Sequence, residues 1–315
     1  MFKLISQRVA LGLLTLLLAS ALIFLGVEAL PGDLASKLLA NNATPENLAA
    51  LRLELGLDRP MLVRYWEWLS HMLQGDFGAS LSNKRAIIGD LGPRALNTFF
   101  LAGYAAVIAV PLAVALGIIA AIRQGGIFDR LVNVVTLFSI SVPEFFIGYV
   151  LVMLLAVKIR LFPVLSNVTP DTDFMQRLYL TFLPMATMVM VVVAHMMRMT
   201  RASVLAVMAS PYIEMAILKG LPKWRIVVQH ALPNALAPIL NVVALNLAYL
   251  IVGVVVVEVV FVYPGMGQWI VDSVSKKDLP VVQACGMIFA AVFITLNILA
   301  DVLAIISNPR LRHPR

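Results

Sequence analysis

The side chains in this sequence that could do chemistry are acids placed inside long apolar runs. Glu144 follows Pro143 near the middle of one run, and Glu258 lies near the end of another. A charged side chain is costly in hydrocarbon, so we expect such a residue to be paired, to pack helices together or to serve a function. For Glu144 two roles stay open: a contact along a translocation path, or a hydrogen bond to a neighbouring helix at a proline kink. For Glu258 and Asp301 we expect helix-packing or interfacial roles.

One apolar run is rich in methionine and holds a single histidine. His195 and Met199 lie four residues apart and would share a helix face with Met188, which would suit a soft metal ion. Methionine is also an adaptable packing residue, and the sequence near His195 supplies no further ligand. We therefore expect no metal site here.

The sequence lacks the short motifs of common catalytic sites. It contains no GxxxxGK[ST] loop for nucleotide phosphates, no HExxH zinc motif and no GxSxG nucleophile turn. Its single cysteine, Cys285, lies in an apolar run and supplies neither a disulfide framework nor a metal cage. We do not expect the chain to be an enzyme, and any ATP that drives its action would be hydrolysed on another chain.

The composition places these residues in a membrane. Of 315 residues, 61% are hydrophobic and 13% are charged, whereas about a quarter are charged in an average soluble domain. The formal net charge of +7 does not indicate nucleic acid binding, because the basic residues gather in loops on one side of the apolar runs. We predict an all-α integral membrane protein in contact with lipid.

Six apolar runs are long enough to cross a bilayer, which needs about 20 helical residues. Lys3 and Arg8 precede the first run and predict a cytoplasmic N-terminus, and an even number of spans brings the C-terminus back to the same side. No linker divides the chain, so we predict one transmembrane domain over residues 1–315. The runs are Val9–Leu30, Leu96–Ile122, Leu131–Val157, Tyr179–Met197, Leu236–Val262 and Val281–Ile306.

Between the first two runs, residues 31–94 form a polar region with its own helix signals. Thr44 and Pro45 would begin one helix, and Pro60 would begin another that ends before Gly75. Leucine and aromatic residues recur at helical spacing in both segments. We predict a small helical cap on the external surface of the membrane.

The polar stretch between the fourth and fifth runs, residues 198–235, is more structured than a plain connection. Ser210 could cap a short helix that Gly220 would end, and a second helical piece would stop at Leu232 and Pro233. A short amphipathic helix at a membrane face can lie in the headgroups or dock a partner, and from the residues alone both interpretations stay open. Its predicted apolar strip consists of Ile213, Ala216 and Ile217.

A turn signal follows the fifth run. Tyr263, Pro264 and Gly265 are followed by Gly267 and Trp269, and a Pro-Gly pair is a strong indication of a turn. The two aromatic residues would fit a belt at the membrane interface. The alternative is an external re-entrant segment or gate.

The loop between the fourth and fifth runs resembles the EAA loop of bacterial ABC importer permeases. Met215 and His230 depart from the general pattern of that loop. The longer segment YIEMAILKGLPKWRIVVQHALPNAL is nevertheless similar to the form of the loop in dipeptide, oligopeptide and nickel permeases, in which a Lys-Gly pair is usual. The residues that carry the likeness are Glu214, Ala216, Lys219, Gly220, Leu232 and Pro233.

Two other segments resemble the same family. The run LGLDRPMLVRYWEWL, followed by GDFGASL, is similar to its first external loop, and the turn with Tyr263 is similar to a phrase that recurs in it. The closing Asn308-Pro309-Arg310 resembles its Asp-Pro-Arg ending. The likeness therefore covers nearly the whole chain.

This resemblance implies a permease subunit of an ATP-driven importer in the bacterial inner membrane. It implies a second homologous permease subunit, two ATPase subunits that bind ATP and Mg, and an external solute-binding protein, with no cofactor on this chain. The residues of the likeness would contact an ATPase through a coupling helix, with Glu214 orienting it and Gly220 allowing close approach. Possible path or gate residues are Glu144, Tyr263, Pro264, Gly265 and Gly267. The alternative function is a carrier driven by an ion gradient, with Glu144 as its proton or cation site.

Overall fold

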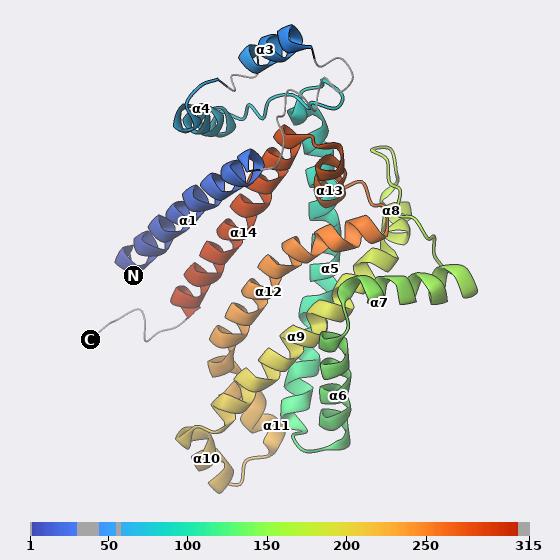
Figure 1. Cartoon of the computed structure of the whole chain (residues 1–315). Coiled ribbons are helices and arrows are strands. Elements are labelled where there is room, and N and C mark those ends of the chain that lie inside the picture. The colour runs from blue at the N-terminus through green and yellow to red at the C-terminus, as the bar shows by residue number, and fades with distance from the viewer. Residues whose placement is uncertain (1, 30–43, 55–57, 308–315) are drawn as a thin grey trace.

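The chain folds into long helices that form an elongated bundle (Figure 1). A computed structural model describes residues 2–29, 44–54 and 58–307, and these residues form no β-strand. In this part, 5 helices are long and apolar enough to cross a membrane, and a bent pair of helices raises the number to 6 if it counts as one span. The all-α membrane architecture is therefore confirmed. The unbroken helices are α1 (Phe2–Glu28), α5 (Ile87–Ile122), α9 (Phe182–Met208), α12 (Leu232–Val260) and α14 (Leu279–Ser307).

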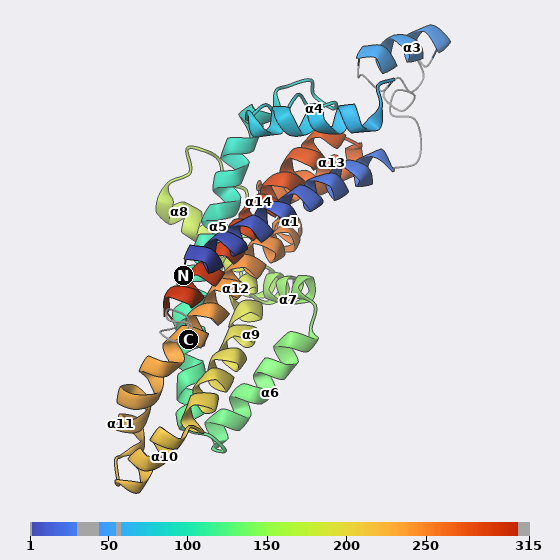
Figure 2. The ribbon, with the colours of Figure 1, turned by 90° about the vertical axis from the view of Figure 1, so that its left-hand side faces the viewer.

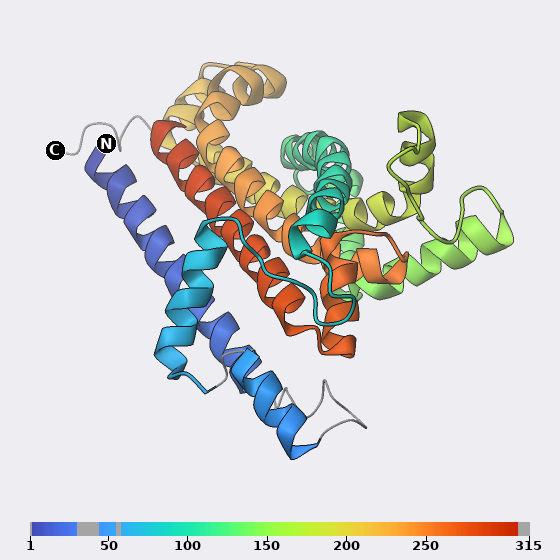
Figure 3. The same cartoon turned by 90° about the horizontal axis from the view of Figure 1, so that it is seen from above.

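Helices α5, α9 and α12 form the centre of the bundle. The largest buried cluster joins them, with Leu101 of α5, Met188 of α9 and Val254 of α12 at most 1% exposed. Helix α14 packs on α12, and α1 packs on α14. Figure 3 shows α1 and α14 side by side along one flank of the bundle. The centre is thus built from three helices that are far apart in the sequence.

Small residues on α5 let α9 approach it closely. They recur at every fourth position, which places them on one face of the helix. A Cβ atom at Gly117 would lie 2.8 Å from the Met197 carbonyl oxygen and 2.8 Å from the Cβ atom of Thr200, so a larger residue would push the two helices apart. The stripe consists of Ala105, Ala109, Ala113 and Gly117.

The third apolar run, Leu131–Val157, is broken near its middle at Pro143, and it makes one span only if its two halves count together. The two halves meet at an angle of 104°, and α7 leaves the bundle sideways in Figure 1. Pro143 has no N–H to continue the first half, and its ring favours the extended conformation of Val142, with φ −98° and ψ 129°. The pieces are α6 (Ile127–Ser141), α7 (Glu144–Leu151) and the π-helical η2 (Val152–Lys158).

Helices α5 and α9 extend well beyond their predicted apolar runs. Helix α5 begins at Ile87 rather than Leu96, and α9 ends at Met208 rather than Met197. The added turns carry polar residues, so the apolar pattern placed the start of α5 too late and the end of α9 too early. Some of these polar residues are bonded inside the bundle, as Arg201 shows.

An ion pair joins α6 to α9. Arg201 Nε donates to Asp129 Oδ1 at 2.6 Å, and Arg201 Nη2 donates to Asp129 Oδ2 at 2.9 Å. The Gly125 N–H and Asn133 Nδ2 donate to the same carboxylate, at 2.9 and 3.1 Å. The Asp129 side chain is 5% exposed, so this two-pronged contact is shielded from solvent.

The helix signals in the polar region after the first run are confirmed, with α3 at Pro45–Glu54 and α4 at Met61–Leu73. Helix α4 packs on α1: Arg64 Nη2 donates to Glu28 Oε1 at 2.5 Å, and the hydroxyl groups of Tyr65 and Ser20 lie 2.8 Å apart. Figure 2 shows α4 at the same end of the bundle as the start of α5. The other parts of the predicted cap, residues 30–43 and 55–57, lie outside the described residues.

We predict that Asp129→Asn lowers the free energy of unfolding by about 3 kcal/mol, because removal of one partner leaves the Arg201 guanidinium shielded without its counter-charge. The matched control is Asp301→Asn, which breaks the Arg8–Asp301 pair, whose side chains are 54% and 36% exposed. That loss should stay below about 1 kcal/mol. Unfolding of the two purified variants in detergent measures the difference, and equal losses would contradict the prediction.

Candidate functional site

The residues singled out from the sequence lie in three separate parts of the bundle. The short helix α10 (Pro211–Leu218) stands at one end, and α13 (Met266–Lys276) lies toward the other (Figure 1). Glu144 begins α7, between these two ends. The structure therefore does not gather the predicted residues into one site.

A glycine ends helix α10. Gly220 has a φ of +75°, which is the left-handed region that favours glycine. Its N–H donates to the Ile217 carbonyl at 2.9 Å, and the N–H of Leu221 donates to the Ala216 carbonyl at 3.3 Å. These two bonds satisfy carbonyl groups that the end of a helix leaves open. The predicted helix end at Gly220 is confirmed.

The start of α10 differs from the prediction. Ser210 stands at the N-cap position, but its hydroxyl donates backwards to the Val207 carbonyl at 2.6 Å and does not cap the helix. Pro211 occupies the first helical position, where its missing N–H costs no hydrogen bond. Glu214 is exposed in the first turn, where the positive end of the helix dipole favours an acid. The helix start therefore depends on Pro211 and Glu214 rather than on a serine cap.

The inner face of α10 packs on the segment that follows it. Ile213 and Ala216 are 0% and 7% exposed, and they cluster with Ile226 and Ala231. Ile217, which we expected on the same strip, is 55% exposed. The buried strip is narrower than predicted, and it fixes α10 to the turns that lead into the fifth apolar run.

The opposite side of α10 exposes large apolar side chains, which we call the α10 outer face. Glu214 and Lys219 are also exposed and flank these side chains. An apolar group at the tip of a membrane protein, beyond the spans, indicates contact with a protein or a membrane. The α10 outer face consists of Tyr212, Met215 and Leu218, which are 44%, 56% and 74% exposed, and Trp224 in the short helical piece that follows is 61% exposed.

The predicted helix stop at Leu232 and Pro233 is wrong, because the helix continues through both residues into α12. The turns directly before Pro233 are π-helical, and this wider winding relieves the clash between the proline ring and the preceding turn. Asn234 Nδ2 adds a hydrogen bond to the His230 carbonyl at 2.9 Å. The pieces that lead into α12 are α11 (Lys223–Arg225) and η3 (Ile226–Ala231).

At the other end of α12, the carboxylate of Glu258 is fully buried and accepts three hydrogen bonds. Oε1 accepts from Thr98 Oγ1 at 2.6 Å, and Oε2 accepts from the N–H groups of Gly267 and Gln268 at 2.7 and 3.1 Å. Thr98 Oγ1 accepts in turn from the Met266 N–H at 2.9 Å. The N–H groups of the first turn of α13 have no partner within that helix, so Glu258 satisfies them and binds α5, α12 and α13 together.

The glycines of this turn are needed because the chain approaches itself closely. A Cβ atom at Gly265 would overlap the Glu258 carboxylate. At Gly267 it would lie 2.6 Å from Val255 Cα and 2.9 Å from Glu258 Oε2. We call Glu258, Thr98, Gly265 and Gly267 the Glu258 cluster.

The aromatic belt that we considered for Tyr263 is wrong, because Tyr263 is 0% exposed. Its hydroxyl donates to the Asn97 carbonyl at 2.9 Å. Asn97 Nδ2 donates to the Pro264 carbonyl at 2.9 Å, and Asn97 Oδ1 accepts from Arg177 Nη2 at 2.5 Å. Trp269 is partly buried. The turn is thus packed against α5 rather than spread along a membrane interface.

Asp278, between α13 and α14, holds a distant segment and was missed in the sequence. It is 3% exposed, and it accepts from the Ser80 hydroxyl and from the N–H groups of Leu81 and Ser82, the latter two at 2.9 and 3.3 Å. The sequence signal was only local, since an Asp before a helix suggests an N-cap. Contacts across 196 to 198 residues have no such signal.

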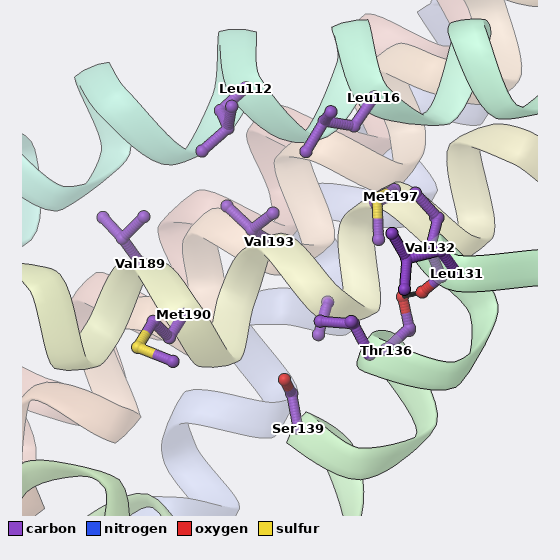
Figure 4. Close-up of a pocket in the computed structure, with 12 residues that line it drawn as sticks. Leu112, Leu116, Leu131, Val132, Thr136, Ser139, Val189, Met190, Val193 and Met197 are labelled. Atoms are coloured by element: carbon purple, nitrogen blue, oxygen red, sulfur yellow. Dashed lines mark hydrogen bonds between the residues drawn. The ribbon is translucent and has the colours of Figure 1, made fainter. Parts of the chain in front are cut away.

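An apolar hollow of about 280 Å³ lies between α5, α6 and α9 (Figure 4). None of the described residues that line it is charged. Thr136 Oγ1 already donates to the Val132 carbonyl at 2.7 Å, which leaves the hydroxyl of Ser139 as the other polar side-chain group among the lining residues (Figure 4). The hollow therefore offers little to hold a charged solute.

The methionine-rich helix α9 serves as packing. Met188 and Met197 are 1% and 4% exposed, whereas His195 is exposed. In the described ranges, no group of three or more His, Cys, Asp or Glu side chains could hold a metal ion. The packing role expected for the methionines agrees with this burial.

We predict that Gly267→Ala lowers the free energy of unfolding by about 2 kcal/mol, because the added methyl group must displace Val255 or the Glu258 carboxylate. Gly103→Ala in α5 is the matched control, since a Cβ atom there meets nothing within 4 Å. The control should lose no stability. Thermal unfolding in detergent tests the pair, and a stable Gly267→Ala variant would show that the turn can move aside.

Two family models match the chain. Residues 113–313 match the family described as the binding-protein-dependent transport system inner membrane component, and residues 1–88 match its N-terminal family. Among curated relatives are the glutathione transport system permease proteins GsiC of Salmonella typhimurium strain LT2 and Escherichia coli strain K12. Each is 36% identical over 304 residues, which are 96% of this chain and 97% of the relative.

These matches decide between the functions that the sequence left open. The relatives are permease subunits and not enzymes, ATP is hydrolysed on separate chains, and such systems work with a solute-binding protein. The ion-driven carrier that we kept as an alternative is a different class of transporter. The resemblance to the family of ABC importer permeases is confirmed. The chain belongs to the inner-membrane permease family of binding-protein-dependent transport systems and is a permease subunit of a peptide-type ABC importer.

Proposed function

We propose that this permease imports a small peptide or a peptide-like solute and is driven through α10 by an ATPase subunit. The observation that carries the proposal is the α10 outer face. Its apolar side chains project from the end of the bundle, and the buried strip on the other side of α10 fixes the helix to η3, which leads into α12. A projecting apolar helix held on a rigid base suits docking into a groove on a partner.

The orientation follows from this proposal. Helix α10 lies at the end of the bundle opposite α4 and the start of α5 (Figures 1 and 2). If α10 meets an ATPase in the cytoplasm, then α4 and α13 face the outside, where the solute-binding protein delivers its cargo. The basic residues before the first span support this orientation, because such residues favour the cytoplasmic side. Both termini are then cytoplasmic.

The interfacial anchor is the rival role for α10, and one feature of the loop argues against it. An interfacial helix places basic residues beside its apolar face to meet anionic headgroups. Here Glu214 is exposed in the first turn of α10, next to Tyr212 and Met215. An acid at that place favours a protein partner with a complementary charge.

The proposed mechanism is a movement of rigid helices between two states. ATP-driven closure of two ATPase subunits would displace α10, and α12 would carry the displacement because the helix continues from η3 to Val260. A second, homologous permease subunit would complete the path. In this scheme Glu214, Lys219 and Gly220 form the contact with the ATPase, Ala216 holds α10 from its buried side, and Leu232 and Pro233 lie in the connection.

The peptide-like substrate is proposed from the relatives named for glutathione transport, because glutathione is itself a tripeptide. Dipeptides and oligopeptides come first among the candidates, followed by nickel and by sugars or opines. In the described part of the chain, the lack of a cluster of metal-binding side chains gives nickel no preference. The choice among peptides would rest mainly with the solute-binding protein.

Purification of the chain from its native membrane, followed by mass spectrometry, tests the assembly. We expect P-loop ATPases and a second permease subunit to accompany it, and the addition of loaded binding protein to stimulate ATP hydrolysis. If the chain is recovered alone and transports solute without ATP, the coupling role of α10 is lost.

We predict that Gly220→Trp leaves the protein in the membrane but lowers ATP-driven uptake by about tenfold or more. A Cβ atom at Gly220 meets nothing within 4 Å, so a bulky side chain projects outward and blocks docking. The substitution also carries strain of about 1–2 kcal/mol, because φ is positive. Gly220→Asn separates the two effects, since Asn tolerates this conformation and is small. Uptake should be nearly normal in Gly220→Asn, and normal uptake in Gly220→Trp would contradict docking at this position.

A further inference from the structure

Glu144 differs from the other acids inside the spans in its bonding. Most of them are bonded within the chain, because an isolated charge is costly in an apolar environment. In the described residues, the carboxylate of Glu144 has neither a hydrogen bond nor an ion pair, although it stands between the two halves of the third span. The bonded acids are Glu28 with Arg64, Asp129 with Arg201, Asp301 with Arg8, and Glu258 with Thr98 and α13.

The carboxylate of Glu144 rests on a glycine of α12. A Cβ atom built on Gly253 would lie 3.4 and 3.5 Å from the two carboxylate oxygens, so no side chain separates Glu144 from the α12 backbone. Gly253 stands well inside α12, away from both ends of that helix. Glu144 itself is half-buried. The acid is therefore held at a defined place and keeps part of its surface free.

The surroundings of Glu144 are open, and among the described residues no basic side chain pairs with it. The α12 residues Tyr249, Val252 and Val256 are 66%, 53% and 40% exposed, and they flank Gly253 in sequence on a face that the described residues leave partly uncovered. Glu144 lies in the first turn of α7, where the positive end of the helix dipole favours an acid. A cation that comes from outside the chain would find a carboxylate that no described residue pairs.

We propose that Glu144 binds the ammonium group of the peptide while it passes through the permease. The inference rests on the proposed import of peptides and names a contact for them within the membrane. A metal ion fits less well, because the described residues offer no set of three metal ligands. An ammonium group has three N–H donors and needs no fixed set of ligands, so one carboxylate can accept from it. A single contact also suits a path, since binding must be weak enough for release.

The test uses the whole complex, with its second permease subunit and ATPases, in liposomes supplied with loaded binding protein. The probes are glutathione and the dipeptide Ala-Ala, each beside its N-acetylated form at equal occupancy of the binding protein. We expect Glu144→Gln to lower uptake of the free-amine probe by about tenfold or more, the scale of a lost hydrogen bond to a charged group. Uptake of the acetylated form should be equal in the two proteins, and the ATP hydrolysis stimulated by loaded binding protein should persist.

Two further variants sharpen the test. Glu144→Asp keeps the charge and should retain most of the uptake. Gly253→Val keeps the carboxylate but fills the space beside it, and should lower uptake of the free-amine probe as Glu144→Gln does. Asp301→Asn is the control for loss of an acid elsewhere in the spans and should leave uptake unchanged.

The outcomes separate the two proposals. If the wild-type complex imports neither probe, the peptide assignment fails and this inference fails with it. If it imports a probe and Glu144→Gln imports it equally well, the inference alone is overturned. If Glu144→Gln instead separates the two permease subunits in detergent, the cation is a basic side chain of the second subunit, and the ammonium contact is excluded.

Discussion

The buried carboxylate of Glu258 is the contact on which the end of the bundle opposite α10 depends. Its two oxygens accept from Thr98 of α5 and from the first turn of α13, so three helices meet at one side chain. Each group needs the others: the acid would be costly without donors, and the α13 N–H groups would be open without the acid. The missing Cβ atoms of Gly265 and Gly267 make the approach possible. The helices α5, α12 and α13 therefore cannot move separately at this end without breaking these hydrogen bonds.

Much of the fold could be predicted from local signals, and the errors have a common cause. Gly220 ends α10 and Pro60 precedes α4, and both boundaries were predictable because they depend on the backbone conformation that each residue itself allows. The predicted stop at Pro233 failed because the π-helical turns before it absorb the proline, a conformation that sequence does not signal. The start of α5 was missed because it carries polar residues that are bonded to distant segments, such as Arg94 to the turn after α12.

The candidate sites were predicted unevenly for the same physical reason. The α10 loop is continuous in sequence, so its apolar pattern and its glycine were visible at once. The Glu258 cluster joins residues about 160 positions apart, and Asp278 reaches nearly 200 positions back. Sequence indicated that Glu258 would serve packing, which its contacts support, but it could not show which donors pair with it. Tyr263 was misplaced at a membrane interface because aromatic character alone does not distinguish a belt from a buried hydroxyl contact.

Helix α12 is continuous, and it links the α10 loop, Gly253 beside Glu144 and the Glu258 cluster. A 29-residue helix is about 43 Å long at about 1.5 Å per residue, so it runs from the α10 loop to the Glu258 cluster as one rigid body. Helix α7 is not part of a long continuous helix, because the 104° break at Pro143 separates it from α6. A displacement of α12 that begins at α10 would therefore slide Gly253 past Glu144, while Glu258 makes α13 follow. The carboxylate of Glu144 lies where α7 meets α12, so a shift of α12 would change its surroundings, and a bound ammonium group would be held in one state and released in the other.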